Sequence, residues 1–177
     1  MMAKKNTTKY QSNRQEKRVA KDLEAKVTVA SGALDFQKAD VRNDLWLIEC
    51  KTTAKPFYSL TEKTWSKIES QAIKDGIRMP LMCIDLEDGK TKVVVLKYLD
   101  FIGLDYDTKA QYLGNPVPDF IEASSVRITG DFINAPFPQE LAEGQYPCYR
   151  RDIKFLNINK HLVVIPYEDF INISNMK

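Results

Sequence analysis

The stretch KADVRNDLWLIECKTT, residues 38–53, constrains the fold most, because a polar turn is followed by an apolar run that ends in charged residues. A β-hairpin is predicted here, with Asn43 and Asp44 as its two-residue loop. In this register Asp40 lies opposite Leu47. The hairpin therefore brings acidic residues from two separate segments onto one sheet.

Side chains of the apolar run are predicted to alternate between the two faces of that sheet. One face carries Leu45, Leu47, Glu49 and Lys51, and the other carries Trp46, Ile48 and Cys50. Asp40 is then a same-face diagonal neighbour of Glu49, roughly 7–8 Å away between backbone positions. Two carboxylates at that separation can bind one cation, although such charges also occur on an ordinary solvated sheet face.

A helix is predicted from Ser12 to about residue 26, because SNRQ has the pattern of a capping box, with Ser12 as N-cap and Gln15 at the third helical position. Its apolar side carries Val19, Ala20, Leu23 and Val27. Glu16 points to the same side. It is either an acid favoured by the helix dipole at the helix start or a third carboxylate directed toward the hairpin.

The segments after the hairpin predict an α/β fold. A helix capped by Ser59 or Thr61 runs to about Asp75 and ends at Gly76, with Trp65 in its core stripe rather than on a base-stacking surface. The strands PLMCIDL and KVVVLK follow, separated by the turn EDGK. This order indicates a mixed β-sheet flanked by helices.

Three parts of the chain are expected: a disordered basic tail over residues 1–11, a core over 12–100, and an extension over 101–177 packed on that core. The extension is rich in proline and predicts loops and short strands. It also contains an echo, because VVVLKYLDFI (93–102) and LVVIPYEDFI (162–171) match at six of ten positions. We interpret the echo as two strands that each lead into a similar helix, with chance as the alternative.

Composition excludes several classes of protein. Hydrophobic residues make up 44% of the chain, and no apolar run approaches the ~20 residues of a membrane span or a secretory signal, so a soluble cytoplasmic protein is expected. Three cysteines and one histidine disfavour disulfide scaffolds and zinc sites; His161 is interpreted as a strand-edge residue. The basic start, with eight Lys and Arg against three acids over residues 1–26, indicates either a polyanion partner or a solvated helix face.

The acidic cluster and its lysine fit phosphodiester hydrolysis. This reaction needs a divalent cation at the phosphate and an activated water, and Mg²⁺ prefers carboxylate and carbonyl oxygens. Asp40 and Glu49 are the candidate ligands, together with the backbone carbonyl of Cys50. Lys51 can orient the water or stabilise the charged phosphorus centre, and Glu16 can add a third carboxylate through a bound water.

Glu16, SGALDFQKAD ending in Asp40, WLIECK with Glu49 and Lys51, and GIRMPLMCI together resemble the PD-(D/E)xK nuclease superfamily. Within it, the archaeal-type and phage Holliday-junction resolvases are most similar, over residues 12–100. The resemblance implies a restriction-endonuclease-like fold. It implies metal-site roles for the three acids and a catalytic role for the lysine. Ala39 stands where the family's proline would be, and residues beyond 100 have no counterpart in the minimal resolvase core.

Four further residues are carried over as DNA-binding or supporting candidates. Lys17 and Arg18 follow the helix acid, where resolvases have an arginine, so either can contact DNA. Ser31 matches a serine near the family's active site, or is an ordinary turn residue. Gln71 lies near the metal centre or on the helix surface.

The resemblance implies a Mg²⁺-dependent, structure-specific DNA endonuclease in which Mn²⁺ can substitute. Such an enzyme would act as a homodimer on branched DNA or four-way junctions, without a membrane, and a phage-encoded form would act in the host cytoplasm. Two alternatives stay open: a restriction-type or repair nuclease on linear or damaged DNA, and a non-catalytic nucleic-acid-binding or phage structural protein.

Overall fold

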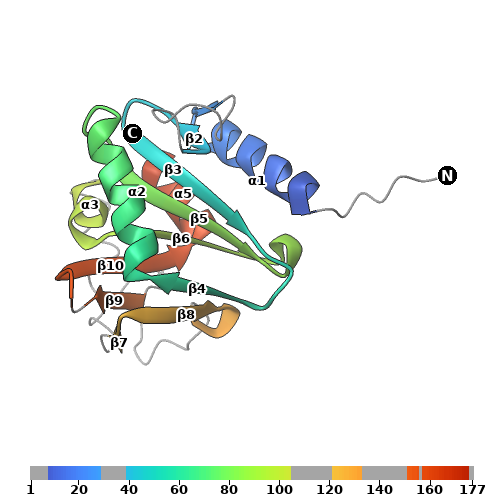
Figure 1. Cartoon of the computed structure of the whole chain (residues 1–177). Coiled ribbons are helices and arrows are strands. Elements are labelled where there is room, and N and C mark those ends of the chain that lie inside the picture. Colours follow the sequence, from blue (N-terminus) through green and yellow to red (C-terminus); the bar gives the residue numbers. More distant parts are fainter. Residues whose placement is uncertain (1–7, 29–38, 105–120, 133–150, 156, 176–177) are drawn as a thin grey trace, which may run out of the picture.

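The structure is a computed structural model that describes residues 8–28, 39–104, 121–132, 151–155 and 157–175. Its centre is an eight-stranded sheet of order β1-β2-β3-β5-β6-β10-β9-β7, and a two-stranded ribbon, β4–β8, lies beside it (Figure 1). The pairs β3–β5 and β7–β9 are parallel and the other pairs are antiparallel. The predicted α/β class, a mixed sheet flanked by helices, is confirmed.

The strands are β1 (Lys26–Val27), β2 (Val41–Arg42), β3 (Trp46–Thr52), β4 (Phe57–Thr61), β5 (Met79–Leu86), β6 (Thr91–Lys97), β7 (Ile121–Glu122), β8 (Ser125–Thr129), β9 (Arg151–Phe155) and β10 (Lys160–Pro166). The helices are α1 (Thr8–Asp22), α2 (Glu62–Lys74), α3 (Tyr98–Gly103) and α5 (Tyr167–Asn175), with short 3₁₀ turns η1 (Glu87–Gly89) and η2 (Gly130–Phe132). No helix of the described ranges is both long and apolar enough to span a membrane.

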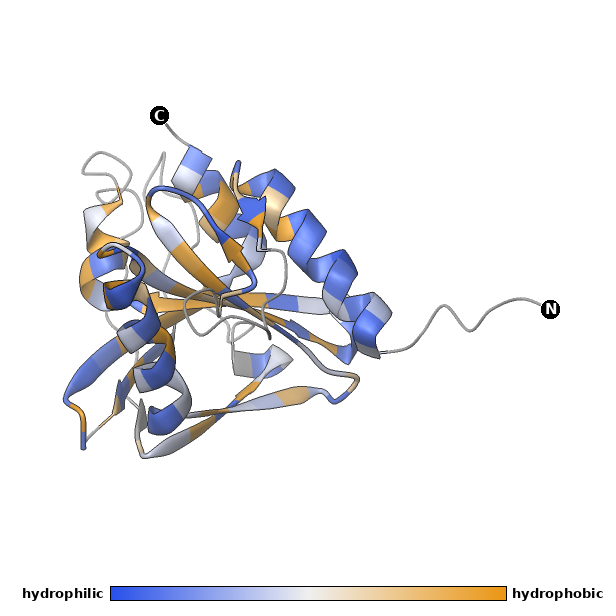
Figure 2. Cartoon of the chain, turned by 45° about the horizontal axis from the view of Figure 1, so that its top comes forward, coloured by the Kyte–Doolittle hydropathy of each residue, from blue (hydrophilic) through white to orange (hydrophobic). Residues whose placement is uncertain are grey.

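Two hydrophobic cores cover opposite faces of the sheet. On one face, α1 and α5 pack against β3, where Trp46 meets Phe170 edge to face with ring centroids 5.6 Å apart. On the other face, α2 contributes Trp65 to a core shared with β5, β6 and the β4–β8 ribbon. Figure 2 shows hydrophobic residues concentrated in the strands and hydrophilic ones along α1. The sheet is therefore buried on both sides, and each buried large apolar side chain contributes roughly 1.5–3 kcal/mol.

The predicted alternation along β3 is confirmed. Trp46, Ile48 and Cys50 belong to the core under α1 and α5. Leu47 instead packs with Ala72 of α2. Glu49 and Lys51 share the parity of Leu47, so they belong to the face covered by α2.

The hairpin register differs from the prediction by two residues. Arg42 pairs with Leu47, not with Leu45, and Asn43 and Trp46 close the turn through the Asn43 N–H and the Trp46 carbonyl. The reason is the Asn43 side chain, whose Oδ1 accepts the N–H groups of Leu45 and Trp46 at 3.0 and 2.7 Å. Asparagine therefore occupies the first position of the turn. A shift of two residues preserves the faces.

Helix α1 begins four residues earlier than predicted and ends four residues earlier. Residues 8–11 are helical, so the predicted tail is wrong for them. Ser12 is not an N-cap, because it lies inside the helix and donates to Glu16 at 3.2 Å. The helix ends where Glu24 adopts a positive φ of 48° and the Ala25 N–H reaches the Ala20 carbonyl at 2.8 Å. That closure is a Schellman-type cap, and it leaves Val27 exposed in β1.

Helix α2 agrees with the prediction. Thr61 is its N-cap, and the Thr61 Oγ1 accepts the Thr64 N–H at 3.1 Å. The helix stops at Lys74, and Gly76 follows with φ +97°, a conformation that glycine adopts without strain. Trp65 is fully buried, as a core residue.

The part beyond residue 100 does not consist of loops and short strands alone. β10 has seven residues and pairs with β6 inside the main sheet, so that Val164 lies opposite Val95. Each member of the sequence echo is a strand followed at once by a helix, β6–α3 and β10–α5, as predicted. Phe101 and Phe170 of the two helices enter the same core. The β10–α5 unit is therefore part of the central packing, which pairing between distant segments decides.

Candidate active site

Asp40 is held in place by two hydrogen bonds to the backbone of β3. Its N–H donates to the Ile48 carbonyl at 3.2 Å, and its Oδ2 accepts the Cys50 N–H at 2.8 Å. Asp40 directly precedes the pairing of Val41 with Ile48, and its hydrogen bonds reach Ile48 and Cys50, the two residues on either side of Glu49. Asp40 and Glu49 therefore lie close together, and the charge of Glu49 acts on the Asp40 carboxyl.

Glu49 and Lys51 form an ion pair on the same face of β3, with 2.5 Å between Lys51 Nζ and Glu49 Oε1. Burial alone would lower the pKa of Lys51, but the hydrogen bond and charge of Glu49, helped by Asp40, more than offset it and raise the pKa. Lys51 is therefore a fixed cation at neutral pH. It can donate to a phosphate or a water but cannot serve as a base.

The carboxyl of Asp40 carries unrelieved negative charge. Burial raises its pKa to about 6, and the charges of Glu49 and, more weakly, Glu16 act in the same direction. The Cys50 N–H and the Lys51 cation oppose this rise. Glu16 of α1 is thus within electrostatic reach of the pair, and the three acids reinforce one another.

A divalent cation fits this pair of acids. Among the described residues, one oxygen of each carboxylate, Asp40 Oδ1 and Glu49 Oε2, has no hydrogen-bond donor. Hard oxygen ligands of this kind suit Mg²⁺, which is usually held by one or two carboxylates and water. Within those same residues no group of three or more His, Cys, Asp and Glu side chains forms a metal cluster. Glu16 and the Cys50 carbonyl stay predictions as ligands.

Gln15 is a structural residue of the site that the sequence did not reveal. It is 1% exposed, and its Nε2 lies 3.1 Å from the Lys51 carbonyl, 3.0 Å from the Cys83 carbonyl and 3.1 Å from Asp85 Oδ1. One side chain of α1 therefore ties β3 to β5 directly beneath Lys51. The available signal was Asp85, an acid inside the apolar strand PLMCIDL.

Arg18 belongs to this support rather than to the exposed surface. Both of its terminal nitrogens contact the carboxylate of Asp85 at 2.8 Å, and its guanidinium lies 4.8 Å from the ring centroid of Tyr167. The Tyr167 hydroxyl donates to Asp22 at 2.9 Å. Lys17, by contrast, is exposed. Of the two carried-over cations, Lys17 is the one placed to meet a partner.

Tyr58 of β4 is a second residue that sequence reasoning missed. It packs against the core under α2, and its pKa is raised by burial and by Glu49, while the Lys51 cation opposes the rise. The Tyr58 hydroxyl therefore lies within electrostatic range of both Glu49 and Lys51.

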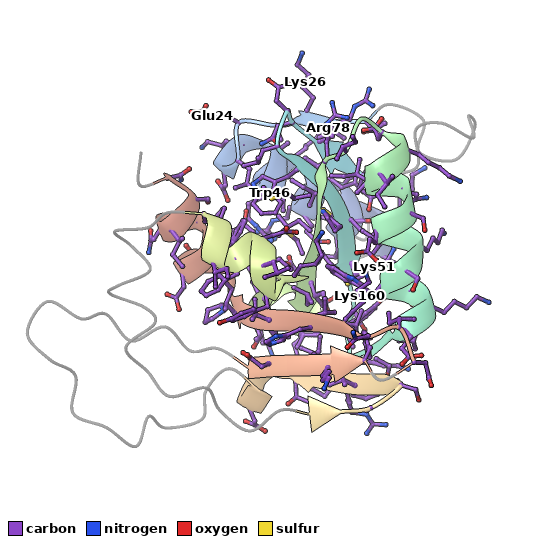
Figure 3. All side chains as sticks on the ribbon, turned by 90° about the vertical axis from the view of Figure 1, so that its left-hand side faces the viewer. Glu24, Lys26, Trp46, Lys51, Arg78 and Lys160 are labelled. Atoms are coloured by element: carbon purple, nitrogen blue, oxygen red, sulfur yellow. The ribbon has the colours of Figure 1, made fainter. Side chains whose placement is uncertain are left out.

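Figure 3 shows Lys51 well away from Lys26 and Arg78, which mark the opposite end of the sheet.

Gln71 and His161 make contacts elsewhere in the structure. Ser31 lies outside the described residues. Gln71 is half-buried on α2, and its carbonyl accepts the Asp75 N–H at 2.9 Å. His161 contacts Asp152 at 2.8 Å and stacks on Tyr98 with centroids 4.3 Å apart. None of these contacts involves Asp40, Glu49 or Lys51.

No family model matches the chain, and no curated protein matches it. Among solved structures, the Holliday junction resolvase Hjc of Archaeoglobus fulgidus is similar, with a TM-score of 0.37 and 19% identity, over 46% of this chain and 72% of that one.

Proposed function

We propose that this chain is a Mg²⁺-dependent DNA endonuclease that hydrolyses phosphodiester bonds in branched DNA, in the manner of a Holliday-junction resolvase. The arrangement of Asp40, Glu49 and Lys51 supports the proposal. Asp40 is oriented by the Cys50 N–H and Glu49 by Lys51, and one oxygen of each acid has no donor among the residues that the structure describes. Two carboxylates and one ammonium group therefore lie together, and the single positive charge does not neutralise both negative charges.

In this proposal Asp40 and Glu49 hold the metal, with Mn²⁺ as a substitute, and Glu16 contributes through water. The bound ion would supply charge neutralisation at the phosphate and a more acidic water. Lys51 donates to the phosphate oxygens or to the attacking water, and its raised pKa keeps it charged for that task. Gln15 donates to the Lys51 carbonyl and so holds the backbone of β3 in place at Lys51.

The DNA partner and the assembly are part of the same proposal. A resolvase cuts two strands related by two-fold symmetry, which a homodimer with two active sites matches. The exposed cations of α1, among them Lys17, provide positive charge beside the site. Light scattering of the purified protein with and without junction DNA tests for the dimer.

The decisive experiment compares a four-way junction with linear duplex of the same sequence, each with Mg²⁺ and with EDTA. Junction cleavage that needs Mg²⁺ and exceeds duplex cleavage supports the proposal. Equal cutting of both substrates would indicate the restriction-type or repair nuclease instead. Absence of cleavage on every DNA, together with retained binding, would indicate a non-catalytic DNA-binding protein.

A further inference from the structure

The β4–β8 ribbon has one buried and one exposed face. Its strands pair antiparallel with Ser59 opposite Arg127. Leu60, Val126 and Ile128 point into the core under α2 and are at most 4% exposed. By alternation the outward side carries Phe57, Ser59, Ser125, Arg127 and Thr129. These outward positions offer hydroxyls, a ring and a cation, and none of them is acidic.

Two cations gather on the ring of Phe57. The Arg127 guanidinium lies 4.4 Å from its centroid, and the Lys55 ammonium lies 5.7 Å away. Both side chains are exposed. A ring in these positions restrains the cations without neutralising them.

Neither Lys55 nor Arg127 has a carboxylate partner within the ranges that the structure describes. Three other arginines there are paired, Arg18 with Asp85, and Arg42 and Arg78 with Asp75. Glu87, an acid whose backbone contacts Lys55, does not pair with the Lys55 ammonium either. Its N–H donates to the Lys55 carbonyl, and its carboxylate contacts Lys90 at 3.8 Å. The charge of the ribbon is therefore available to an anion from outside.

The ribbon begins beside the candidate active site. Lys55 is four residues beyond Lys51, which is at most ~13 Å along an extended chain. The inward side of β4 meets the site, since Tyr58 is within electrostatic reach of Lys51 and Glu49. Lys55 and Arg127 lie at Phe57 on the outward side of the same strand. On one DNA strand a phosphate occurs every ~3.4 Å of helix axis. A strand whose phosphate lies at Lys51 can therefore present its next few phosphates to Lys55 and Arg127.

We propose that the outward face of the β4–β8 ribbon binds the sugar-phosphate backbone of the DNA strand that enters the active site. This inference rests on the proposed nuclease function and names a binding surface for it. Arginine, lysine, serine and threonine are the side chains that proteins use for backbone contacts. Contacts to phosphate and sugar position DNA without selecting a sequence.

The test measures DNA affinity in the Glu49→Gln protein, which keeps substrate intact, at several salt concentrations. Replacing Lys55 and Arg127 together by alanine should reduce the slope of log affinity against log salt by about 1.8, since each duplex phosphate contact contributes ~0.9. The matched control replaces two exposed lysines, Lys26 and Lys74. Lys26 lies at the other end of the sheet (Figure 3), and Lys74 ends α2 beside Asp75, which contacts Arg42 and Arg78. This control should change the slope much less. An unchanged slope in the ribbon variant, or an equal loss in the control, would overturn the inference.

A second variant separates positioning from charge. Phe57→Leu keeps both cations and removes the ring that restrains them, so the salt slope should hold while affinity falls about two- to fivefold. Affinity equal to that of the parent would contradict the role of the ring. If the Glu49→Gln parent binds no DNA at all, the proposed function fails. If the parent binds and the ribbon variants match it, only the ribbon surface fails. Thermal melting confirms that each variant is folded.

Discussion

Two acidic residues on either side of β3 differ in how completely their charge is satisfied: Asp85 of β5, and Asp40, which directly precedes β2. Asp85 is 5% exposed and accepts hydrogen bonds from both terminal nitrogens of Arg18 and from Gln15. Asp40 has a single donor in the described chain, the Cys50 N–H, and faces the charges of Glu49 and Glu16. A buried acid with a full set of donors stabilises the fold, whereas an acid left partly unsatisfied is suited to bind a cation.

The largest expected effect is on catalysis. Asp40→Asn, Glu49→Gln and Lys51→Ala should each lower junction cleavage by at least about a hundredfold, because each removes charge that acts on the phosphate or its metal. Junction binding should change little, since cationic side chains dominate DNA affinity. Single-turnover cleavage and electrophoretic binding measure the two quantities. If these variants cut at the normal rate, the active-site assignment is wrong.

The second effect is on stability and concerns Asp85. Asp85→Ala leaves the half-buried Arg18 without its carboxylate and removes one of the three acceptors of Gln15, so the free energy of unfolding should fall by about 3 kcal/mol. Urea denaturation measures this, and Glu87→Ala, which breaks only the exposed pair with Lys90, is the control with a change below about 0.5 kcal/mol. A comparable small loss for both would mean that Asp85 is not a structural anchor.

The third effect is metal binding, which is expected at Asp40 and not at Asp85. Mg²⁺ at ten times its dissociation constant should stabilise the protein by about 1.4 kcal/mol, because it binds the folded state alone. EDTA should reverse the rise in melting temperature, and Asp40→Asn should abolish it. The effect requires an intact fold but no substrate. A rise that persists in Asp40→Asn would place the metal elsewhere.

The smallest effect is the pH dependence of the metal-free protein. The folded pKa of Asp40, about 6, exceeds its ordinary value of 3.8, so its stabilising contribution is complete below pH ~4 and is lost as the pH rises through 6. Asp40→Asn should therefore be more stable than the natural protein at pH 7, by about 1 kcal/mol after allowance for solvent screening, and nearly equal at pH 4. Melting curves in EDTA at both pH values measure the difference. A destabilised variant at pH 7 would contradict unrelieved charge at Asp40.

Local patterns predicted the elements whose causes are local. Thr61 caps α2 through its own side chain, and the alternation along β3 follows from strand geometry. Errors arose where a side chain had a choice of partners. Ser12 resembles a cap but bonds to Glu16 inside a longer helix, and Asn43 bonds forward in the turn and moves the register.

The candidate site shows the same division. Asp40, Glu49 and Lys51 were predictable because strand alternation alone puts the last two on one face, and a register error of two residues leaves faces unchanged. Gln15 and Tyr58 were not predictable, because their roles depend on carbonyls and charges of segments distant in the chain. The same holds for β10, whose partner strand β6 lies more than sixty residues earlier.

The sequence by itself determined which residues carry charge, which strand faces they occupy and where helices can be capped, because these depend on neighbours within a few positions. The tertiary structure decided which charges are satisfied. Gln15 and Arg18 reach Asp85 only because α1 packs across β3 and β5. Asp40 keeps its raised pKa because burial and the charge of Glu49 outweigh the Cys50 N–H, its one hydrogen-bond donor within the described ranges, and the Lys51 cation. Hydrogen bonding and burial act over distances in space, and the folded chain alone defines those distances.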